Sequence, residues 1–285
     1  MPAFNSFPYN YNIYNGSLSN VEILSTDIVV FDGFSISDGT AMIVQELIES
    51  EPTREILGGP VPRDDGLYTI ADYWREKEIT VSGIITRDTK QALDNYLDTI
   101  RQNLRTREAN LDITRLNDDG TINYVRRYIA TLKNPEALFA DRAGWNITIC
   151  PFTAVFTCRT PFAKSRDYTS ATDTLTSSPT TLTATPTGTY KSKMVVTLTF
   201  NSASSVTSVN INNQTTSEQI AYSGAISAAD ILEFDSELKT VTKNSVLVDY
   251  TGIFPNLELG ENSILFTING TFNITCTIKY KNTYL

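Results

Sequence analysis

The side chains that most often carry catalysis are imidazoles, carboxylates and thiols, and this chain lacks the first kind altogether. None of its 285 residues is a histidine. Ser-His-Asp and Cys-His mechanisms, zinc sites built on histidine and the commonest general base near neutral pH are therefore excluded. Most hydrolase mechanisms need one of these devices. We therefore expect the protein not to be an enzyme.

Paired carboxylates are the remaining candidates, because a glycosidase needs only two of them. Asp64 with Asp65 and Asp230 with Asp235 are such pairs. A structural interpretation is simpler, since the first pair lies among turn-forming residues and the second flanks a predicted strand. The Asp-Asp-Gly segment at 118–120 lacks the alternating oxygen ligands of a calcium loop and is predicted to be a hairpin turn. We predict no catalytic, cofactor or metal residues and keep a glycan-cleaving enzyme as an alternative.

The three cysteines, Cys150, Cys158 and Cys276, are an odd number without CxxC spacing, and each lies in an apolar, strand-like run. A thiol in such a run behaves as a small hydrophobic side chain. No residue near it in the sequence would activate it as a nucleophile. We predict buried thiols outside any disulfide, which suit a reducing compartment.

The charge balance is acidic, with 23 Lys and Arg against 32 Asp and Glu and a net charge of −9. Specific nucleic-acid binding is not expected, because a grip on phosphate needs clustered positive charge. No run approaches the roughly 20 apolar residues of a membrane helix, so no membrane insertion is expected. Residues 1–20 also lack the basic segment and apolar core of an export signal.

Composition changes sharply near residue 168. All 13 arginines lie at or before Arg166, and 13 of the 21 residues at 169–189 are Ser or Thr. Charged residues number 40 among the first 168 and only 15 among the last 117. We therefore predict a first domain at 1–168, a Ser/Thr-rich linker or edge loop at 169–189 and a second domain at 190–285.

Strand and helix patterns alternate in the first domain. Residues 76–86 alternate apolar and polar side chains, with Gly83 on the apolar face, as in a half-buried strand. Apolar residues at three- and four-residue steps predict a helix at 89–107. Segments 111–116 and 122–132 are predicted to pair as a hairpin.

Two segments depart from these patterns. The strand expected at 145–158 changes its apolar parity at Pro151, which predicts a β-bulge there. Segment 49–68 contains Gly58, Gly59 and further turn formers, and it is predicted to be a long loop.

The second domain alternates more regularly. Apolar side chains recur at every second position in 194–200, 264–268 and 272–280. Turns rich in Asn, Gly and Ser separate these segments, which is typical of an antiparallel sandwich or jelly roll. The fold class predicted for the whole chain is mainly β.

The order of these elements resembles the siphophage distal tail protein family, also called the Dit or phage tail component family. The motifs that carry the resemblance are YWREKEITVSGII (73–85), the helix after it, FTAVFTCRTPF (152–162), DILEFDSELKTVTKN (230–244), GIFPNLELGENSI (252–264) and the final TIKYKNTYL. The Phe-Pro-x-Leu-x-x-Gly-x-Asn core, from Phe254 to Asn262, is the most specific of them.

This resemblance implies a tail-tube-like β-sandwich with one α-helix, followed by a galectin-like antiparallel β-sandwich. It also implies a homo-oligomer, a hexameric ring formed by the first domain. The ring would join the tail tube protein to the tail-tip, baseplate hub or receptor-binding proteins of a long-tailed phage. Such a protein would be assembled in the bacterial host cytoplasm and reside at the virion tail tip. Segment 49–68 is then a candidate arm between subunits.

The sequence departs from the galectin-like pattern at the sugar site. Such sites use an aromatic platform, often Trp, with polar residues that include His, yet Trp74 and Trp145 both precede the second domain. The candidate substitutes are Tyr190, Tyr222, Tyr250, Tyr280 and Tyr284. We expect this domain to dock protein partners rather than a glycan. A carbohydrate-binding adhesin that recognises the host surface is the alternative function.

Overall fold

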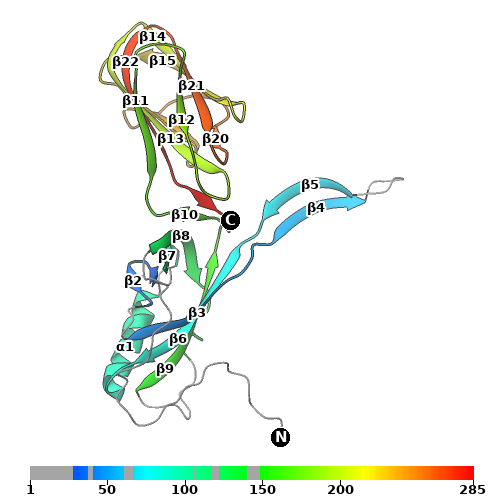
Figure 1. Ribbon diagram of the computed structural model, residues 1–285, viewed down its shortest axis with the longest axis vertical. Helices are drawn as coiled ribbons and strands as arrows, with labels where there is room; N and C mark the ends of the chain where they lie inside the picture. Colours follow the sequence, from blue (N-terminus) through cyan, green and yellow to red (C-terminus); the bar gives the residue numbers. More distant parts are fainter. Residues whose placement is uncertain (1–27, 38–40, 61–66, 106, 117–121, 140–147) are drawn as a thin grey trace.

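The computed structural model describes residues 28–37, 41–60, 67–105, 107–116, 122–139 and 148–285. The chain forms two lobes placed end to end, with a two-stranded arm projecting from the region between them (Figure 1). Each lobe has its own cluster of buried apolar side chains. The predicted mainly β class with one helix is confirmed.

The first lobe is built on a nine-stranded antiparallel sheet with the order β2-β1-β7-β8-β9-β6-β3, in which β10 pairs with β8 and β23 pairs with β10. Its elements are β1 (Ile28–Phe31), β2 (Phe34–Ser35), β3 (Met42–Glu49), β6 (Lys77–Thr86), α1 (Lys90–Asn103), β7 (Ala109–Leu116), β8 (Ile122–Leu132), β9 (Ile149–Cys158), β10 (Ala163–Ser165) and β23 (Thr283–Tyr284). The predicted hairpin is confirmed as β7 and β8.

Helix α1 forms where the three- and four-residue apolar spacing predicted it. Thr89 is the N-cap, and its hydroxyl accepts a hydrogen bond of 3.2 Å from the amide of Ala92. The apolar stripe buries Leu93, Leu97 and Ile100 in the first core. The helix ends at Asn103, a few residues earlier than predicted.

Strand β6 lies near the middle of this sheet, between β9 and β3. Its alternating face is buried as predicted, and Gly83 stands where β3 approaches most closely. A methyl group on Gly83 would lie 2.1 Å from the carbonyl oxygen of Ile43 and 2.9 Å from Cε1 of Phe152. The glycine is therefore required by packing.

The predicted bulge at Pro151 is wrong. Strand β9 pairs with β6 in one unbroken register, in which Pro151 lies opposite Ile84. Burial follows the even positions from Cys150 onward, and Ile149 is only half-buried. The apparent change of parity came from counting Ile149 as a core residue. Residue 147 lies outside the described residues.

The second lobe is a sandwich of two antiparallel sheets. The orders are β11-β22-β13-β16-β17-β18, with β20 on β13, and β12-β21-β14-β15-β19. The bounds are β11 (Thr169–Leu175), β12 (Thr180–Ala184), β13 (Ser192–Ser204), β14 (Val206–Asn213), β15 (Glu218–Ile226), β16 (Ile231–Asp235), β17 (Thr240–Lys243), β18 (Val246–Leu247), β19 (Thr251–Gly252), β20 (Asn256–Leu257), β21 (Asn262–Ile268) and β22 (Thr271–Tyr280). The three predicted alternating segments form β13, β21 and β22.

The segment 169–189 is not a linker or loop over most of its length, and that prediction needs correction. Strand β11 pairs with β22 along seven positions, and β12 pairs with β21 along five. Leu175, Leu182 and Ala184 enter the second core. Ser and Thr occupy the exposed positions, because β-branched Thr suits a strand surface as well as it suits a loop.

The motif at 254–262 is organised by one buried amide. Asn262 donates to the carbonyl oxygens of Glu258 at 2.8 Å and Gly260 at 3.0 Å. Its own oxygen accepts from the amide of Glu258 at 2.9 Å and from the side chain of Asn213 at 3.1 Å. A buried side chain that satisfies this many backbone groups fixes the loop before β21.

Within the described residues, the single helix falls short of the length and apolar character needed to cross a membrane.

Replacing Gly83 by Ala is expected to destabilise the first lobe by about 1–3 kcal/mol, because the new methyl group overlaps the β3 backbone. Urea unfolding followed by tryptophan fluorescence measures this, since both tryptophans belong to the first 168 residues. The matched control is Ser82→Ala on the opposite face of β6. Equal unfolding free energies for the two variants would contradict the packing argument.

Candidate functional site: the strand arm and the domain junction

The arm is a two-stranded sheet made of β4 (Arg54–Pro60) and β5 (Leu67–Trp74). It leaves the first sheet between β3 and β6 and extends away from both lobes (Figure 1). The prediction of a long loop at 49–68 is therefore wrong for 49, 54–60 and 67–68, which lie in strands. Pro60 is tolerated because each strand of a two-stranded ribbon has one unpaired side, and the glycines begin where the register shifts between Leu57 and Gly58.

Cross-strand ion pairs stabilise the arm near its base. The guanidinium of Arg54 binds both carboxylate oxygens of Asp72, with Nε 2.7 Å from Oδ1. Arg75 Nε lies 2.6 Å from Oε2 of Glu55, and this hydrogen bond lowers the pKa of the Glu55 carboxyl to about 2. These pairs are exposed, so each contributes little to stability, but together they set the register of the ribbon.

Apolar side chains project from the arm into solvent. Ile56 is 61% exposed and Ile70 is 72% exposed, with Leu57 and Tyr73 also largely uncovered. An isolated two-stranded hairpin is marginally stable in water. Exposed apolar side chains on such an element indicate a surface that a protein partner covers.

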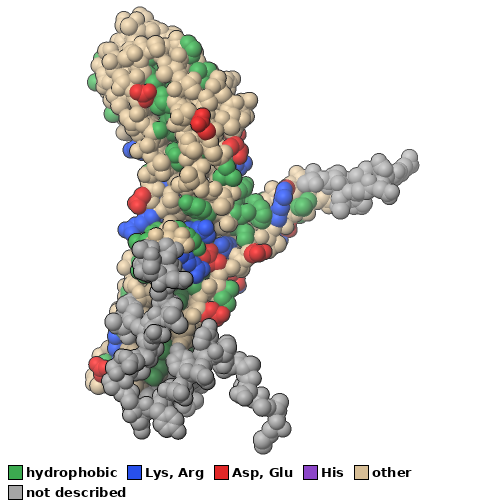
Figure 2. Space-filling view, viewed as in Figure 1, with side chains coloured by type: hydrophobic (Ala, Val, Ile, Leu, Met, Phe, Trp, Pro, Cys, Tyr) green, Lys and Arg blue, Asp and Glu red, His purple; other side chains and the backbone are tan. Residues whose placement is uncertain are grey.

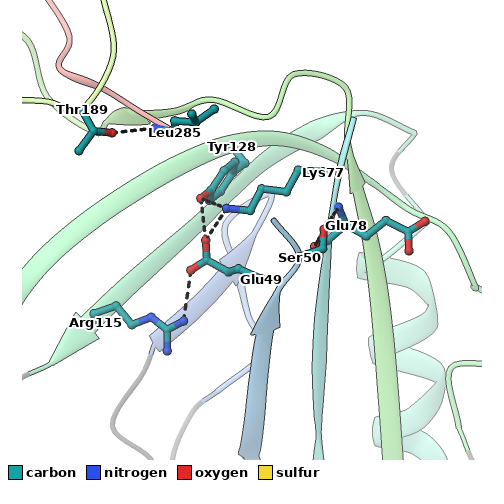
Figure 3. Close-up of polar contacts among 8 residues, drawn as sticks. All are labelled: Glu49, Ser50, Lys77, Glu78, Arg115, Tyr128, Thr189 and Leu285. Carbon is teal, nitrogen blue, oxygen red and sulfur yellow. Dashed lines mark hydrogen bonds and ion pairs between the residues drawn. The ribbon is translucent and has the colours of Figure 1, made fainter. Parts of the chain in front are cut away.

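A buried charge cluster lies where the arm joins the first sheet (Figure 3). Glu49, the last residue of β3, accepts hydrogen bonds at Oε2 from Lys77 Nζ at 2.9 Å and from the Tyr128 hydroxyl at 2.7 Å. Arg115 approaches Oε1 at 3.2 Å. Lys77 also donates to the Tyr128 hydroxyl at 3.1 Å. We call these four residues the root cluster.

The protonation states of the root cluster follow from these contacts. Burial alone would raise the pKa of Glu49, but the donors Lys77, Tyr128 and Arg115 together outweigh it and lower that pKa. Burial, reinforced by the charge of Glu49, raises the pKa of Tyr128. The cluster therefore holds an ionised carboxylate beside a neutral phenol.

Hydrogen bonds of the backbone and of the Ser50 hydroxyl also hold the base of the arm. The amide and hydroxyl of Ser50 both donate to the carbonyl oxygen of Glu78 at 2.9 Å, and the amide of Glu78 donates back to the Ser50 hydroxyl at 2.9 Å. The Arg75 amide donates to the Thr53 carbonyl at 2.8 Å. The arm thus continues the β3–β6 pair with little backbone left unsupported.

The two lobes are joined by strands that cross between them. Strand β10 pairs with β23, and Ser165 and Asn282 exchange hydrogen bonds of 2.8 and 3.0 Å. Lys164 forms an ion pair with Glu237 of the second lobe. The rings of Phe162 and Tyr190 stack with centroids 4.3 Å apart. Residues from the beginning, the middle and the end of the second lobe's sequence therefore hold it against the first lobe.

The tyrosines proposed to replace a galectin-type sugar platform do not form one surface. Tyr222 and Tyr280 are buried in the second core. Tyr190 stacks on Phe162, and Tyr284 packs on the first core beneath Arg126. Tyr250 alone among the five is more than a third exposed. This arrangement gives no support to a tyrosine-based sugar site.

The acidic pairs considered for catalysis have structural partners or lie outside the described residues. Asp64 and Asp65 belong to 61–66 and are outside. Asp230 pairs with Lys243 at 2.9 Å, and this contact with the surrounding hydrogen bonds lowers its pKa to about 2. Asp235 accepts from the amides of the turn that follows β16. The segment 118–120 also lies outside the described residues.

All three cysteines are buried, as predicted. Burial raises the pKa of Cys158 and of Cys276 to about 12, so both thiols stay protonated at neutral pH. Among the residues that the structure describes, no group of three or more His, Cys, Asp or Glu side chains could hold a metal ion.

Sequence reasoning missed the root cluster and the strand character of the arm. The four cluster residues are scattered between positions 49 and 128, so no local motif could reveal them. Residues 54–57 are Arg-Glu-Ile-Leu, which does not alternate, and the glycines and proline directly after them favour a loop. The strand character of β4 therefore had no local signal in the sequence.

The chain is similar to known proteins of phage tails. Residues 187–284 match the family model described as the siphovirus-type tail component, C-terminal domain. The crystal structure of the Dit protein of phage SPP1, called a paradigm of the hub adsorption apparatus in phages that infect Gram-positive bacteria, matches with a TM-score of 0.67 at 15% identity, covering 91% of this chain and 99% of that chain. No curated protein matches the chain.

Two structures of the activated baseplate of phage p2 match more weakly. The one with Ca has a TM-score of 0.39 at 6% identity, and the one with Sr has 0.37 at 8%. Each match covers 89% of this chain and 97% of the other chain. The predicted resemblance to the distal tail protein family is confirmed by the family model for the second lobe and by the shared fold for most of the chain.

Replacing Glu49 by Gln is expected to destabilise the first lobe by about 3 kcal/mol at neutral pH, because Lys77 and Arg115 lose their buried carboxylate. The folded pKa of Glu49 lies below the value of 4.5 expected when unfolded. Its ionic stabilisation is therefore fully present above pH 4.5 and is lost as the pH falls through the folded pKa. The difference between wild type and variant should shrink in acid.

Urea unfolding at neutral pH and at several pH values below 4.5 checks this expectation. The matched control is Glu51→Gln, which removes an exposed carboxylate only two residues away. A pH-independent difference for Glu49→Gln, or an equal effect of the control, would show that the root cluster does not stabilise the fold through charge.

Proposed function

We propose that this protein is a structural hub protein at the tail tip of a long-tailed phage. In this proposal six copies close into a ring that joins the tail tube to the tail-tip or host-adhesion proteins. The shared fold with SPP1 Dit and the family match of the second lobe support the hub role. The number six rests on the family resemblance, and assembly would take place in the bacterial host cytoplasm.

The observation that carries the ring proposal is the arm with its uncovered apolar side chains. A closed ring needs a heterologous contact, in which one surface of a subunit meets a different surface of its neighbour. The arm reaches beyond its own lobe (Figure 1), so it can contact a neighbouring copy without displacing any local packing. Ile56 and Leu57 are consecutive in β4, so the exposed apolar side chains lie on both faces of the ribbon, and a neighbour that covers either face removes apolar surface from water.

Among the strands that the structure describes, β3 lies at an edge of the first sheet, which is a second route to a neighbour by strand addition. Its register breaks between Val44 and Glu46, however, and Glu46 is an exposed acidic residue on it. Bulges and charged side chains are devices that discourage pairing at an edge. The arm is therefore the better candidate for the subunit contact.

A carbohydrate-binding adhesin is less well supported. The second lobe lacks tryptophan and histidine, and its tyrosines are dispersed between the core, the domain junction and, for Tyr250, the exposed surface. Docking of protein partners suits the second lobe better, because its exposed apolar side chains include Leu247 and Ile253. Enzymatic activity is not part of the proposed function.

Replacing both Ile56 and Ile70 by Asp is expected to abolish ring formation while leaving a folded monomer, because both side chains are exposed in the single chain and would be covered in the ring. Mass photometry and negative-stain images, with the tail tube protein present as a template, measure the particle. Wild type should add six times the mass of the 31.6-kDa chain to the mass of the template.

The matched control replaces both Leu247 and Ile253 by Asp, which adds the same two charges at side chains of similar exposure on the second lobe. It should leave the ring intact. A wild-type chain that stays monomeric with its template, or a ring that survives both arm substitutions, would refute this assembly mode.

A further inference from the structure

A small, half-open pocket lies at the junction of the two lobes, between β10, the beginning of β13 and the turn after β16. Its volume is about 270 Å³. Three lysines line it, Lys164, Lys193 and Lys281, and they come from segments far apart in the sequence. Figure 2 shows Lys and Arg side chains gathered at this waist of the molecule. We call this pocket the junction pocket.

Positive charge in the junction pocket exceeds the negative charge available to neutralise it. The carboxylates lining the pocket are Asp235 and Glu237. Glu237 is engaged by Lys164, and Asp235 accepts from the backbone amides of residues 237 and 238 at 2.7 and 2.9 Å. Three ammonium groups therefore line the pocket with two carboxylates, which leaves one positive charge in excess.

The other two lysines have neutral partners. Lys193 Nζ lies 2.7 Å from the side-chain oxygen of Asn256. The ammonium of Lys281 stands over the ring of Tyr168, 4.6 Å from its centroid. Neither lysine forms an ion pair within the described part of the chain. The protein as a whole is acidic, so this local positive excess is unusual for it.

The surroundings of Lys193 and Lys281 make the charged, ammonium form of each side chain less stable. Burial, and then the charges of Lys191 and Lys239, lower the pKa of Lys193, and they outweigh the opposite effect of Glu218 and Glu237. Burial, and then the charges of Arg127 and Lys164, lower the pKa of Lys281, and they outweigh the opposite effect of Glu237 and Asp167. An anion placed between the two ammonium groups would raise the pKa of both lysines, because an opposite charge at short range favours the ammonium form.

The shape of the pocket limits what that anion can be. A volume of about 270 Å³ is at the lower end of small-molecule sites and holds one short chain with a charged end. The rim carries exposed apolar side chains, with Leu238 71% and Tyr168 57% exposed. An oligosaccharide or nucleotide would find too little volume, and the aromatic ring in the lining, Tyr168, already contacts Lys281. The carboxylate of an acidic side chain would contact the lysines of the pocket, and apolar residues on either side of it would contact the rim.

We propose that the junction pocket is a receptor for a carboxylate side chain, Glu or Asp between apolar residues, presented by a protein of the tail that docks on this chain. The carboxylate would lie between Lys193 and Lys281, and its apolar neighbours would cover Leu238 and Tyr168. This identity of the partner as a tail protein rests on the function proposed above. The pocket itself does not depend on ring formation.

The test uses the full chain with ¹³C-labelled lysines and a capped tripeptide in which Glu stands between two leucines. NMR titration should show saturable shifts at Lys193 and Lys281 and a rise in the pKa of both. The same peptide with Gln in place of Glu should bind about tenfold more weakly, since it lacks the charge. Lys281→Met and Lys193→Met should each weaken binding by a similar factor, and Lys281→Arg should retain it.

The control is Lys90→Met on the first turn of α1, which should leave binding unchanged. Equal binding of the Glu and Gln peptides would overturn the proposal, as would an equal effect of acetate or inorganic phosphate at the same concentration, which would mean an unspecific anion site. The proposal would also be overturned if binding is lost when the chain is diluted while the tripeptide stays in excess. That result would assign the pocket to a second copy of this chain. Because the peptide assay needs no ring, its outcome is independent of the particle masses that test the hub function.

Discussion

One largely buried carboxylate constrains the geometry of the first lobe. Glu49 ends β3, and the groups that neutralise it come from the beginning of β6, from β7 and from β8. A buried charge without such partners costs several kcal/mol, so these strand ends must converge on it. The chain leaves the sheet at the same point to form the arm. The root cluster therefore decides where the arm begins and how firmly it is held.

The junction between the lobes, like the root cluster, is held by polar groups that find partners within the chain. The chain enters the second lobe after β10 and returns from it at β23, so that two segments cross and pair with each other. Two hydrogen-bonded crossings restrain the lobes more than one flexible linker would. Lysines from the returning strand and from the start of β13 meet there, which concentrates positive charge on an acidic protein. A tail hub with a restrained outer lobe would present that surface in a fixed place.

Much of the fold could be predicted because its signals are local. The alternation in β6, β13, β21 and β22 and the apolar stripe of α1 reflect periodicities of two and 3.6 residues that the chain carries in itself. Errors arose where local composition misleads. Ser and Thr suit strands as well as loops in β11 and β12, and the glycines and proline of β4 are acceptable in a ribbon whose strands each have one partner.

The sequence by itself determined the mainly β class, the change of character near residue 168, the absence of histidine chemistry and the resemblance to distal tail proteins. The tertiary structure alone decided the arm, the root cluster and the junction pocket. The physical reason is distance along the chain. Glu49 meets partners 28 and 79 residues away, and Lys164 meets Glu237 across 73 residues. Such contacts depend on how the strands order themselves in the sheet, and no periodicity within one strand records that order.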